Sequence, residues 1–410
     1  MCVYAAESLQ QRWFIGEERT KLKIEIPENV LKIIKILNDN AHDAYVVGGC
    51  VRDAVLGRIP SDWDITTPAL PHEIKKLFRK TFDTGIEHGT VTVLMGDGQY
   101  EVTTYRIDGA YSDNRHPDEV TFTDDLKEDL RRRDFTINAM AYSPQRGLVD
   151  EFSGIEDLYS QTIRAVGNAD ERFSEDALRM LRAIRFSAQL DYYIEEDTFN
   201  AMIKHAPELV HVSEERIFSE LNKAFTSDHP DRAALLYDTG LDKYICKSFC
   251  LIKKDAVKKM NPKLSALRHI RWADLCRDMD PKDVGTILKE LKTDNDTMYR
   301  TVTLVREVKK KMPETEAEIR KELCLIGPEL FDDLAELKEA SEETVDLKNK
   351  IILRGDAYNL KMLDIDGKDL LEMGYPRGPQ IGKILNSLLD KVLEDPSLNE
   401  KEILKRSLCE

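Results

Sequence analysis

Two patterns of apolar and polar positions divide the chain. Over residues 28–160, short runs with alternating or β-branched residues predict strands at 44–47, 62–66, 90–95, 100–105 and 119–122. Helical periodicity between these runs predicts helices at 26–37 and 72–78, the second directly after Pro71. Strands mixed with helices in this way indicate an α+β region.

The periodicity changes beyond about Asp170. Apolar residues then recur every three or four positions, as expected for helices that bury one face. Such helices are predicted at 173–190, 197–206, 214–226, 231–237, 282–291, 297–312 and 381–393. We therefore expect an α+β head followed by an all-helical arm.

Length and cysteine usage narrow the class of protein. A chain of 410 residues is long enough for about two to four domains with their own cores. Its seven cysteines are scattered without a Cys-x-x-Cys pair or zinc-ligand spacing, which is typical of reduced thiols in a cytosol. No segment has the character of a signal peptide or a membrane span. We expect a soluble cytoplasmic protein with no membrane contact and no structural metal.

The net charge of −16 argues against a nucleic-acid partner only if the charge is spread evenly. Basic residues gather at four places, 75–80, 131–133, 253–259 and 309–311. Each cluster alone is typical of a solvated helix face. Because the clusters recur on helical segments, they also allow a surface that follows a nucleic-acid backbone.

The strongest indication of chemistry follows the first predicted strand. That strand ends in Gly48-Gly49, a helical pattern follows, and Asp62-Trp63-Asp64 opens the next β-prone run. Alternate residues of a strand point to the same side, so we expect Asp62 and Asp64 to project together, with Trp63 on the other face. Paired carboxylates repel unless a cation lies between them, and such ligands suit Mg²⁺. Gly48 and Gly49, near a helix N-terminus, allow backbone N–H groups to approach a phosphate.

Neither feature is specific alone, because a lone Gly-Gly is usually a turn and a lone Asp-x-Asp a solvated strand edge. Together, with Arg52-Asp53 and Gly57-Arg58 between them, they indicate a phosphate cradle beside a metal-holding pair. This arrangement suggests nucleotidyl transfer by a two-metal mechanism. Glu101, on an alternating strand pattern, is either a third catalytic carboxylate or an ordinary solvent-facing residue.

A second motif lies in residues 129–141, where three arginines enter an apolar stretch. It is either the start of an amphipathic helix or a nucleotide-binding face. On a helix, Asp134 and Asn138 are four residues apart and share one face. That face could hold a ribose, with Asp134 accepting a hydrogen bond from a ribose hydroxyl, and Arg133 could meet triphosphate oxygens.

A third motif predicts base recognition. Asp176, Arg179, Arg182 and Arg185 step by three along a predicted helix and form a polar ridge, which is usually a salt-bridged surface. Cytosine and adenine present an amino donor beside a ring-nitrogen acceptor, whereas uracil and guanine present the reverse order. Asp176 only accepts and Arg179 only donates, so this pair could select C or A. Arg182 and Arg185 would then reach triphosphate or primer phosphates.

These motifs, with two more at 150–158 and 215–221, resemble the signature of the class II tRNA nucleotidyltransferase and bacterial poly(A) polymerase family. This family belongs to the polymerase-β nucleotidyltransferase superfamily. The resemblance implies an α+β fold in which a nucleotidyltransferase head with a small mixed sheet precedes an elongated all-helical region. The implied parts are an N-terminal extension (1–25), the head (26–160), the neck (161–232), the body (233–325) and the tail (326–410).

The resemblance also implies template-independent addition of C, C and A to the 3′ end of tRNA from CTP and ATP. Two Mg²⁺ ions are expected at Asp62 and Asp64, with Glu101 as the third catalytic carboxylate. Arg115 is expected in a flexible loop that assists the change from C to A addition. The residues expected at the nucleotide are Gly48, Gly49, Arg52, Arg133, Asp134, Asn138, Asp176, Arg179, Arg182 and Arg185.

The motifs leave alternatives open. Poly(A) polymerases, and enzymes that add only CC or only A, share the head motifs, while an inactive RNA-binding module is an alternative of a different class. An acidic chain that ends soon after its Gly-rich segment favours tRNA, and intact carboxylates argue against an inactive module. We expect the helical arm to bind tRNA and the segment 215–221 to brace the base-selecting helix. Ser153-Gly154 stands where the family commonly has two glycines, which we expect to affect hinge geometry rather than chemistry.

Overall fold

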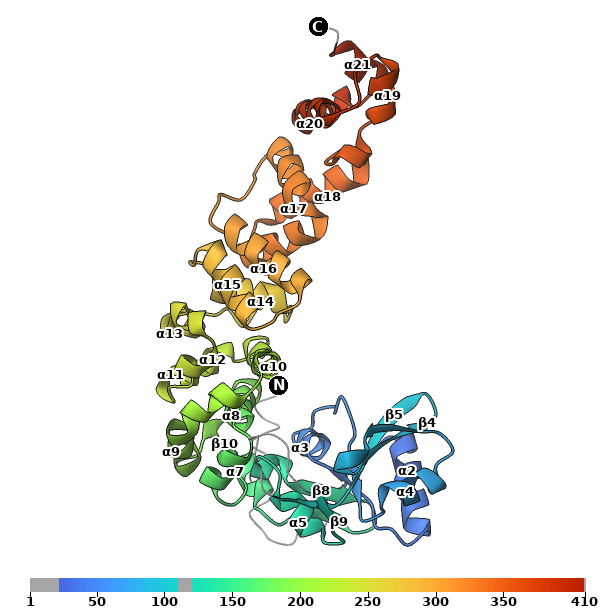
Figure 1. Ribbon diagram of the computed structural model, residues 1–410, viewed down its shortest axis with the longest axis vertical. Coiled ribbons are helices and arrows are strands. Elements are labelled where there is room, and N and C mark those ends of the chain that lie inside the picture. Colours follow the sequence, from blue (N-terminus) through green and yellow to red (C-terminus); the bar gives the residue numbers. More distant parts are fainter. Residues whose placement is uncertain (1–21, 110–119, 409–410) are drawn as a thin grey trace. The chain divides into compact units, whose positions relative to one another are not determined.

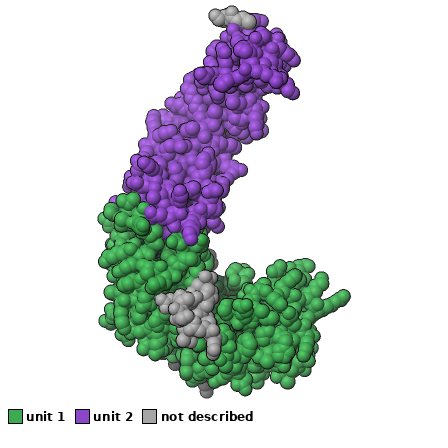
Figure 2. All heavy atoms as spheres, viewed as in Figure 1, with its two compact units in different colours: residues 1–258 green, residues 259–410 purple. Residues whose placement is uncertain are grey.

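The computed structural model describes residues 22–109 and 120–408 (Figure 1). The chain divides into two compact units, residues 1–258 and 259–410, which are coloured separately in Figure 2. The boundary between the units falls within the predicted body, and the four-part division into head, neck, body and tail stays a prediction. In the described ranges, no helix combines the length and the apolar character that crossing a bilayer requires.

A seven-stranded sheet in the order β3-β4-β5-β2-β1-β8-β9 organises the first unit. Its strands are β1 Tyr45–Val47, β2 Ile65–Thr67, β3 Thr81–Gly85, β4 Thr90–Met95, β5 Gly98–Thr104, β8 Met140–Ser143 and β9 Gly147–Asp150. Strands β2 and β5 pair in parallel, and the other neighbours in this sheet are antiparallel. The predicted mixed sheet is therefore confirmed.

Two smaller strand pairs accompany this sheet. β6 (Arg106–Asp108) pairs with β7 (Val120–Phe122), and β10 (Thr162–Ile163) pairs in parallel with β11 (Tyr193–Ile194). Residues 110–119 come between β6 and β7 in the chain. The predicted loop residue Arg115 thus lies outside the described residues.

The helices of the first unit form where one face can be buried. In α2, for example, Val30, Ile33, Ile34 and Leu37 are buried and recur at helical spacing, so this helix packs its apolar face toward β4 and α4. The helices are α2 Glu28–Asp39, α3 Gly49–Val55, α4 Pro71–Leu77, α5 Leu126–Arg131, α6 Gly154–Tyr159, α7 Ala169–Glu175, α8 Leu178–Leu190, α9 Glu196–His205, α10 Glu214–Phe225, α11 Leu235–Asp238, α12 Asp242–Ile245 and α13 Lys254–Lys258.

The helical interpretation of residues 129–141 is wrong. Helix α5 ends at Arg131, a short 3₁₀ turn covers Thr136–Asn138, and the chain then enters strand β8. All four residues of β8 are buried, because the strand lies inside the sheet between β1 and β9. A short apolar run that is buried on both faces shows no alternation, so periodicity does not distinguish it from a helix.

The single helix predicted over 173–190 is also wrong. It is two helices, α7 and α8, separated by Asp176 and Ala177. Asp176 has extended backbone angles, and its side chain accepts a hydrogen bond from the Leu178 amide at 3.1 Å. Asp176 therefore caps the start of α8 instead of lying on its surface.

The second unit is helical throughout the described residues, which confirms the predicted helical region. Its helices are α14 Arg268–Leu275, α15 Pro281–Glu290, α16 Asn295–Glu307, α17 Glu316–Leu337, α18 Glu342–Arg354, α19 Gly367–Glu372, α20 Pro379–Glu394 and α21 Lys401–Arg406. Helix α17 is kinked at Gly327, whose positive φ of 80° precedes Pro328.

Candidate active site

Asp62, Asp64 and Glu101 belong to segments that meet at one end of the central sheet. The parallel register pairs Ile65 of β2 with Val102 of β5, so Asp64 and Glu101, each one residue earlier, lie level on neighbouring strands. Asp62 lies two residues before Asp64, and all three carboxylates are exposed. Strand β2 begins only at Ile65, which differs from the predicted start at residue 62.

The backbone nevertheless continues the sheet as far as Asp64, because the Val47 amide donates to the Asp64 carbonyl at 3.0 Å. At the end of β1 nearest the carboxylates, Gly48 follows the last strand residue, Val47, and Asp64 lies beside it on the neighbouring strand segment. Main-chain pairing fixes where the acidic segment leaves the sheet, while its side chains stay open to solvent.

Mutual repulsion disfavours ionisation of all three carboxyl groups, those of Asp62, Asp64 and Glu101, at the same time. Partial desolvation of Asp64 and then the charge of Asp62 raise the pKa of Asp64 to about 6; Glu101 raises it further and Arg133 opposes the rise. Within the described ranges, no three or more His, Cys, Asp or Glu side chains form a group that could hold a metal ion. The oxygen donors suit Mg²⁺, provided that substrate phosphates complete the ligand set.

Gly48 allows an arginine to approach the start of α3. Its φ is +82°, and a Cβ at this position would lie 3.0 Å from Nη1 of Arg133. The Gly48 amide donates to the Met140 carbonyl at 3.1 Å, so the predicted phosphate contact through this amide is not supported. The Gly49 amide is different, because it opens α3 and has no acceptor within the helix.

A chain of polar contacts joins the sheet region to α8. Arg52 Nη1 donates to Asn138 Oδ1 at 2.8 Å, and Asn138 Nδ2 donates to Asp134 Oδ1 at 3.1 Å. Asp134 Oδ2 accepts from Nε of Arg182 at 2.7 Å and pairs with its Nη2 at 2.6 Å. Asp134 and Asn138 are thus in contact, as predicted, although no α-helix brings them together.

Protein donors already occupy the Asp134 carboxylate. Its Oδ1 also accepts from the Phe135 amide at 2.8 Å, so each oxygen has two donors. Burial raises the pKa of Asp134, but Arg182 and Asn138 outweigh burial and lower it to about 2. A ribose hydroxyl could bind this carboxylate only by displacing one of these donors.

The proposed base-selecting pair is held from several sides. Arg179 Nη1 contacts Glu175 at 2.5 Å and the Arg172 carbonyl at 3.1 Å. Its Nη2 donates to the Arg132 carbonyl at 3.1 Å. Asp176 Oδ2 accepts from Arg216 Nη2 at 2.8 Å. Both side chains are therefore fixed in position by neighbours on other segments.

Helix α10 braces α8, as predicted for the segment 215–221. Arg216 pairs with Asp176, and Glu220 pairs with Arg185 at 2.5 Å. Arg185 also donates to Gln189 and is buried, so it is poorly placed for the phosphate contact that the sequence predicted.

Two residues of the site, Glu175 and Asp129, lie within the predicted motifs but had no predicted role. Glu175 contacts both Arg172 and Arg179 at 2.5 Å, and its spacing of four from Arg179 could have indicated this. Asp129 is fully buried and accepts from Thr66, Arg132 and Arg133, but its partner Thr66 is distant in sequence.

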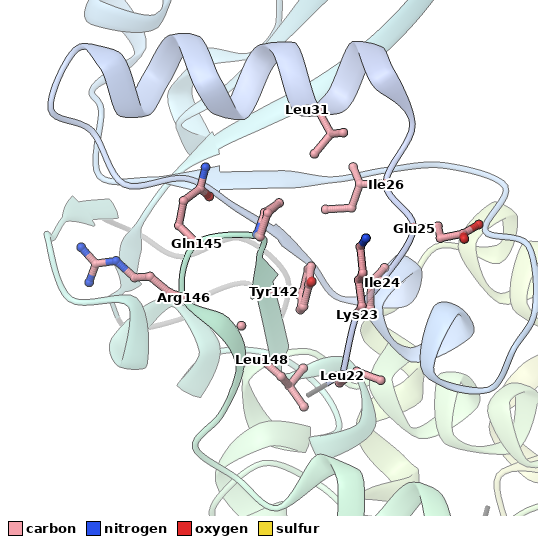
Figure 3. A pocket seen from close by; sticks show the side chains of 12 residues that line it. Leu22, Lys23, Ile24, Glu25, Ile26, Leu31, Tyr142, Gln145, Arg146 and Leu148 are labelled. Atoms are coloured by element: carbon pink, nitrogen blue, oxygen red, sulfur yellow. The ribbon is translucent and has the colours of Figure 1, made fainter. Parts of the chain in front are cut away.

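A cavity of about 710 Å³ is lined by residues of the segments 22–31 and 142–148, and Figure 3 shows its lining side chains. Tyr142, Ile26 and Leu148 contribute to its wall, as does Arg146. Arg146 pairs with Asp43, which precedes β1, whereas Gly48 and Asp64 lie at the other end of that strand. We assign this cavity no part in the chemistry.

Family models cover most of the chain. Residues 44–164 match the family described as the poly A polymerase head domain. Residues 191–251 match the family described as the RNA and SrmB-binding site of polymerase A. Residues 268–408 match the family described as tRNA nucleotidyltransferase domain 2.

Relatives match over nearly their full length. The CCA-adding enzyme of Geobacillus kaustophilus is 37% identical over 393 residues, which cover 93% of this chain and 96% of that protein. The CCA-adding enzyme of Lactococcus lactis subsp. lactis is 38% identical over 400 residues, covering 93% and 97%.

Solved structures agree with this result. The Bacillus stearothermophilus CCA-adding enzyme, determined in complex with CTP, has a TM-score of 0.82 and 33% identity, covering 93% of this chain and 98% of that one. The Thermotoga maritima CCA-adding enzyme complexed with tRNA has a TM-score of 0.61 and covers 94% and 96%; at 22% identity it shows the fold alone. Polymerase-β nucleotidyltransferases are generally metal-dependent. The chain belongs to the family of class II CCA-adding enzymes, which share the poly(A) polymerase head.

Proposed function

We propose that this chain adds C, C and A to the 3′ end of tRNA from CTP and ATP and releases pyrophosphate. The observation that carries the proposal is the strand register that places Asp64 level with Glu101, two residues after Asp62 and within the field of Arg133. An acidic group beside a guanidinium suits a bound metal–triphosphate complex. The CCA-adding enzymes that match over nearly their full length support tRNA as the substrate.

Asp62 and Asp64 would hold two Mg²⁺ ions together with phosphate oxygens of the nucleotide, and Glu101 would complete the acidic site. When bound, magnesium supplies positive charge that favours ionisation of the RNA 3′-hydroxyl and offsets charge on the leaving pyrophosphate. The exposure of these carboxylates leaves room for both substrates.

Arg133, the Gly49 amide and Arg182 are the groups best placed to bind the triphosphate. Arg182 uses Nε and Nη2 for Asp134, and the described residues give its Nη1 no hydrogen-bond partner. Its side chain is 34% accessible, whereas the side chains of Arg179 and Arg185, the other ion-paired arginines of α8, are 11% accessible. Asp134 then acts by orienting Arg182 rather than by binding ribose.

Asp176 and Arg179 would select the base. An acceptor beside a donor matches the pairing edges of cytosine and adenine and mismatches those of uracil and guanine. Arg216 holds Asp176, and Glu175 holds Arg179, so the pair is oriented before a nucleotide arrives. Pre-orientation of this kind reduces the entropy lost on binding.

Poly(A), CC-only and A-only addition use the same head motifs and are distinguished by their products. Relatives that match over nearly their full length are CCA-adding enzymes, which favours CCA addition, and the three intact carboxylates disfavour an inactive RNA-binding module. We infer that the helical region binds the tRNA acceptor arm through its backbone and shape, and that the protein works in the cytoplasm.

The test supplies a tRNA that lacks its 3′ terminal triplet, with Mg²⁺ and each labelled nucleotide in turn. We expect two C residues and one A to be added, with no incorporation from UTP or GTP. Oligo(A) products, or arrest after CC, would replace the proposal by the corresponding alternative. Absence of any addition under these conditions would support the inactive module.

A further inference from the structure

One buried aromatic ring lies among three arginines of the candidate site. Phe186 of α8 is 4% exposed. The Cζ atoms of Arg52, Arg182 and Arg185 lie 5.1, 5.5 and 3.9 Å from its ring centroid. Arg52 comes from α3, beside the glycine pair, whereas Arg182 and Arg185 come from α8 itself. The ring thus connects the two segments that carry the phosphate-binding and base-selecting groups.

Each of these guanidinium groups also has an acidic partner. Arg52 pairs with Asp53 at 2.8 Å, Arg182 with Asp134 at 2.6 Å and Arg185 with Glu220 at 2.5 Å. A carboxylate holds the N–H edge of a guanidinium, whereas an aromatic ring attracts its flat face. Contacts to both the edge and the face fix position and orientation together.

The ring itself is held by a second aromatic residue. Phe135 packs edge-on against Phe186, with ring centroids 5.8 Å apart and an interplanar angle of 81°. Phe135 is fully buried and directly follows Asp134, the partner of Arg182. The same short segment therefore positions both the ring and the carboxylate that act on Arg182.

We infer that Phe186 is a positioning residue for nucleotide binding. The negative face of its ring attracts the guanidinium groups of Arg52 and Arg182 and fixes their positions beside the carboxylate site. Three cations close to one another repel, and the negative face of the ring offsets part of that repulsion. This inference rests on the proposed function, because it depends on Arg182 binding the triphosphate. The opposing view is that Phe186 only fills volume in the core.

Fluorinated phenylalanines at position 186 separate these two views, since fluorine removes negative charge from the ring face with little change in shape. We expect the KM for CTP to rise stepwise from 4-fluoro- to 3,4,5-trifluorophenylalanine, reaching about three- to tenfold. The kcat and the melting temperature should change little. A KM that stays flat across the series would overturn the inference.

Phe186→Leu gives a second measurement, with Phe249→Leu as the matched control. Phe249 is also fully buried in the first unit, and no guanidinium contact to its ring is found among the described residues. We expect both variants to lose stability but only Phe186→Leu to bind CTP more weakly in equilibrium dialysis. Equal CTP affinity in the two variants would overturn the inference. Because dialysis requires no turnover, it tests Phe186 even if the wild-type chain fails to extend tRNA, which would count against the proposed function alone.

Discussion

Two groups of charged residues, one in each compact unit, contrast with each other. In the first unit, Asp62, Asp64 and Glu101 stay exposed, and their mutual repulsion helps to raise the pKa of Asp64. In the second unit, Arg320 is 3% exposed and pairs with Asp356 at 3.1 Å. Exposed acidic groups that repel one another favour the binding of a cation, whereas a buried arginine with hydrogen-bonded partners connects helices.

The partners of Arg320 show how a buried and paired charge stabilises the fold. It donates to the Leu393 carbonyl at 2.8 Å and to the Glu394 carbonyl at 3.1 Å, at the end of α20. Helix C-termini leave carbonyl groups without partners, and a buried cation satisfies them. The charge of Arg320 therefore stabilises the fold, whereas the exposed carboxylates of Asp62, Asp64 and Glu101 are available for chemistry.

The largest effect should come from removing a charge at the open site. Asp64→Asn should lower the rate of CMP addition on the order of 10³-fold, because it removes a metal ligand. The melting temperature without nucleotide should stay the same or rise, since like-charge repulsion falls. Asp97→Asn, in the exposed turn before β5, is the control and should retain full activity. An active Asp64→Asn enzyme would contradict the metal assignment.

Removal of the buried charge of Arg320 should lower stability instead of activity. Arg320→Met should lower the free energy of unfolding of the second unit by about 3 kcal/mol, because it leaves buried carbonyl and carboxylate groups unpaired. Lys321→Met is the control, since the pair of Lys321 with Glu394 is exposed and should contribute less than about 1 kcal/mol. Denaturant unfolding compares the two variants. Equal losses would show that burial of Arg320 is unimportant.

A smaller effect is expected at the base-selecting pair. Asp176→Asn keeps an oxygen that can cap Leu178 but replaces by a donor the acceptor that contacts Arg216 and that we propose reads the base. Discrimination of CTP against UTP should fall by about 1–3 kcal/mol, while Mg²⁺ dependence stays as in the wild type. Asp197→Asn, on the exposed face of α9, is the matched control. Unchanged discrimination would remove Asp176 from base selection.

The smallest effect isolates one contact. Gly48→Ala and Gly57→Ala both place a side chain at positive φ, +82° and +70°, where residues other than glycine are strained. A Cβ at position 48 would lie 3.0 Å from Nη1 of Arg133 and 3.8 Å from the Asn138 carbonyl oxygen, whereas a Cβ at position 57 would meet nothing within 4 Å among the described residues. Gly48→Ala should therefore raise the KM for nucleotide beyond any change in Gly57→Ala. Identical KM values would show that this approach of Arg133 is not needed.

Local sequence predicted the parts of the site that depend on local geometry. The motif around Asp62 and Asp64 predicted an acidic segment beside the first strands, and both residues are exposed directly before β2; the helical pattern at 26–37 predicted α2. The head, the mixed sheet and the helical region followed from periodicity together with the family motifs. These features depend on residues that are close in sequence or on a whole motif.

Contacts between distant segments could not be predicted in the same way. Arg182 reaches Asp134 across 48 positions, and Arg216 reaches Asp176 across 40. The interruption between α7 and α8 at Asp176 depends on contacts of its side chain with the Leu178 amide and Arg216. Helical periodicity alone does not reveal this interruption, because the pattern continues across it. Tertiary contacts decided these features, and they changed the expected role of Asp134 from ribose binding to orientation of Arg182.

A crystal of the protein grown with CTP and Mn²⁺, measured for anomalous scattering at the manganese edge, tests the central claim most directly. We predict manganese bound by Asp62 and Asp64, within reach of Glu101 and of the triphosphate oxygens. Nucleotide bound at the site without manganese between these carboxylates and the phosphates would contradict it.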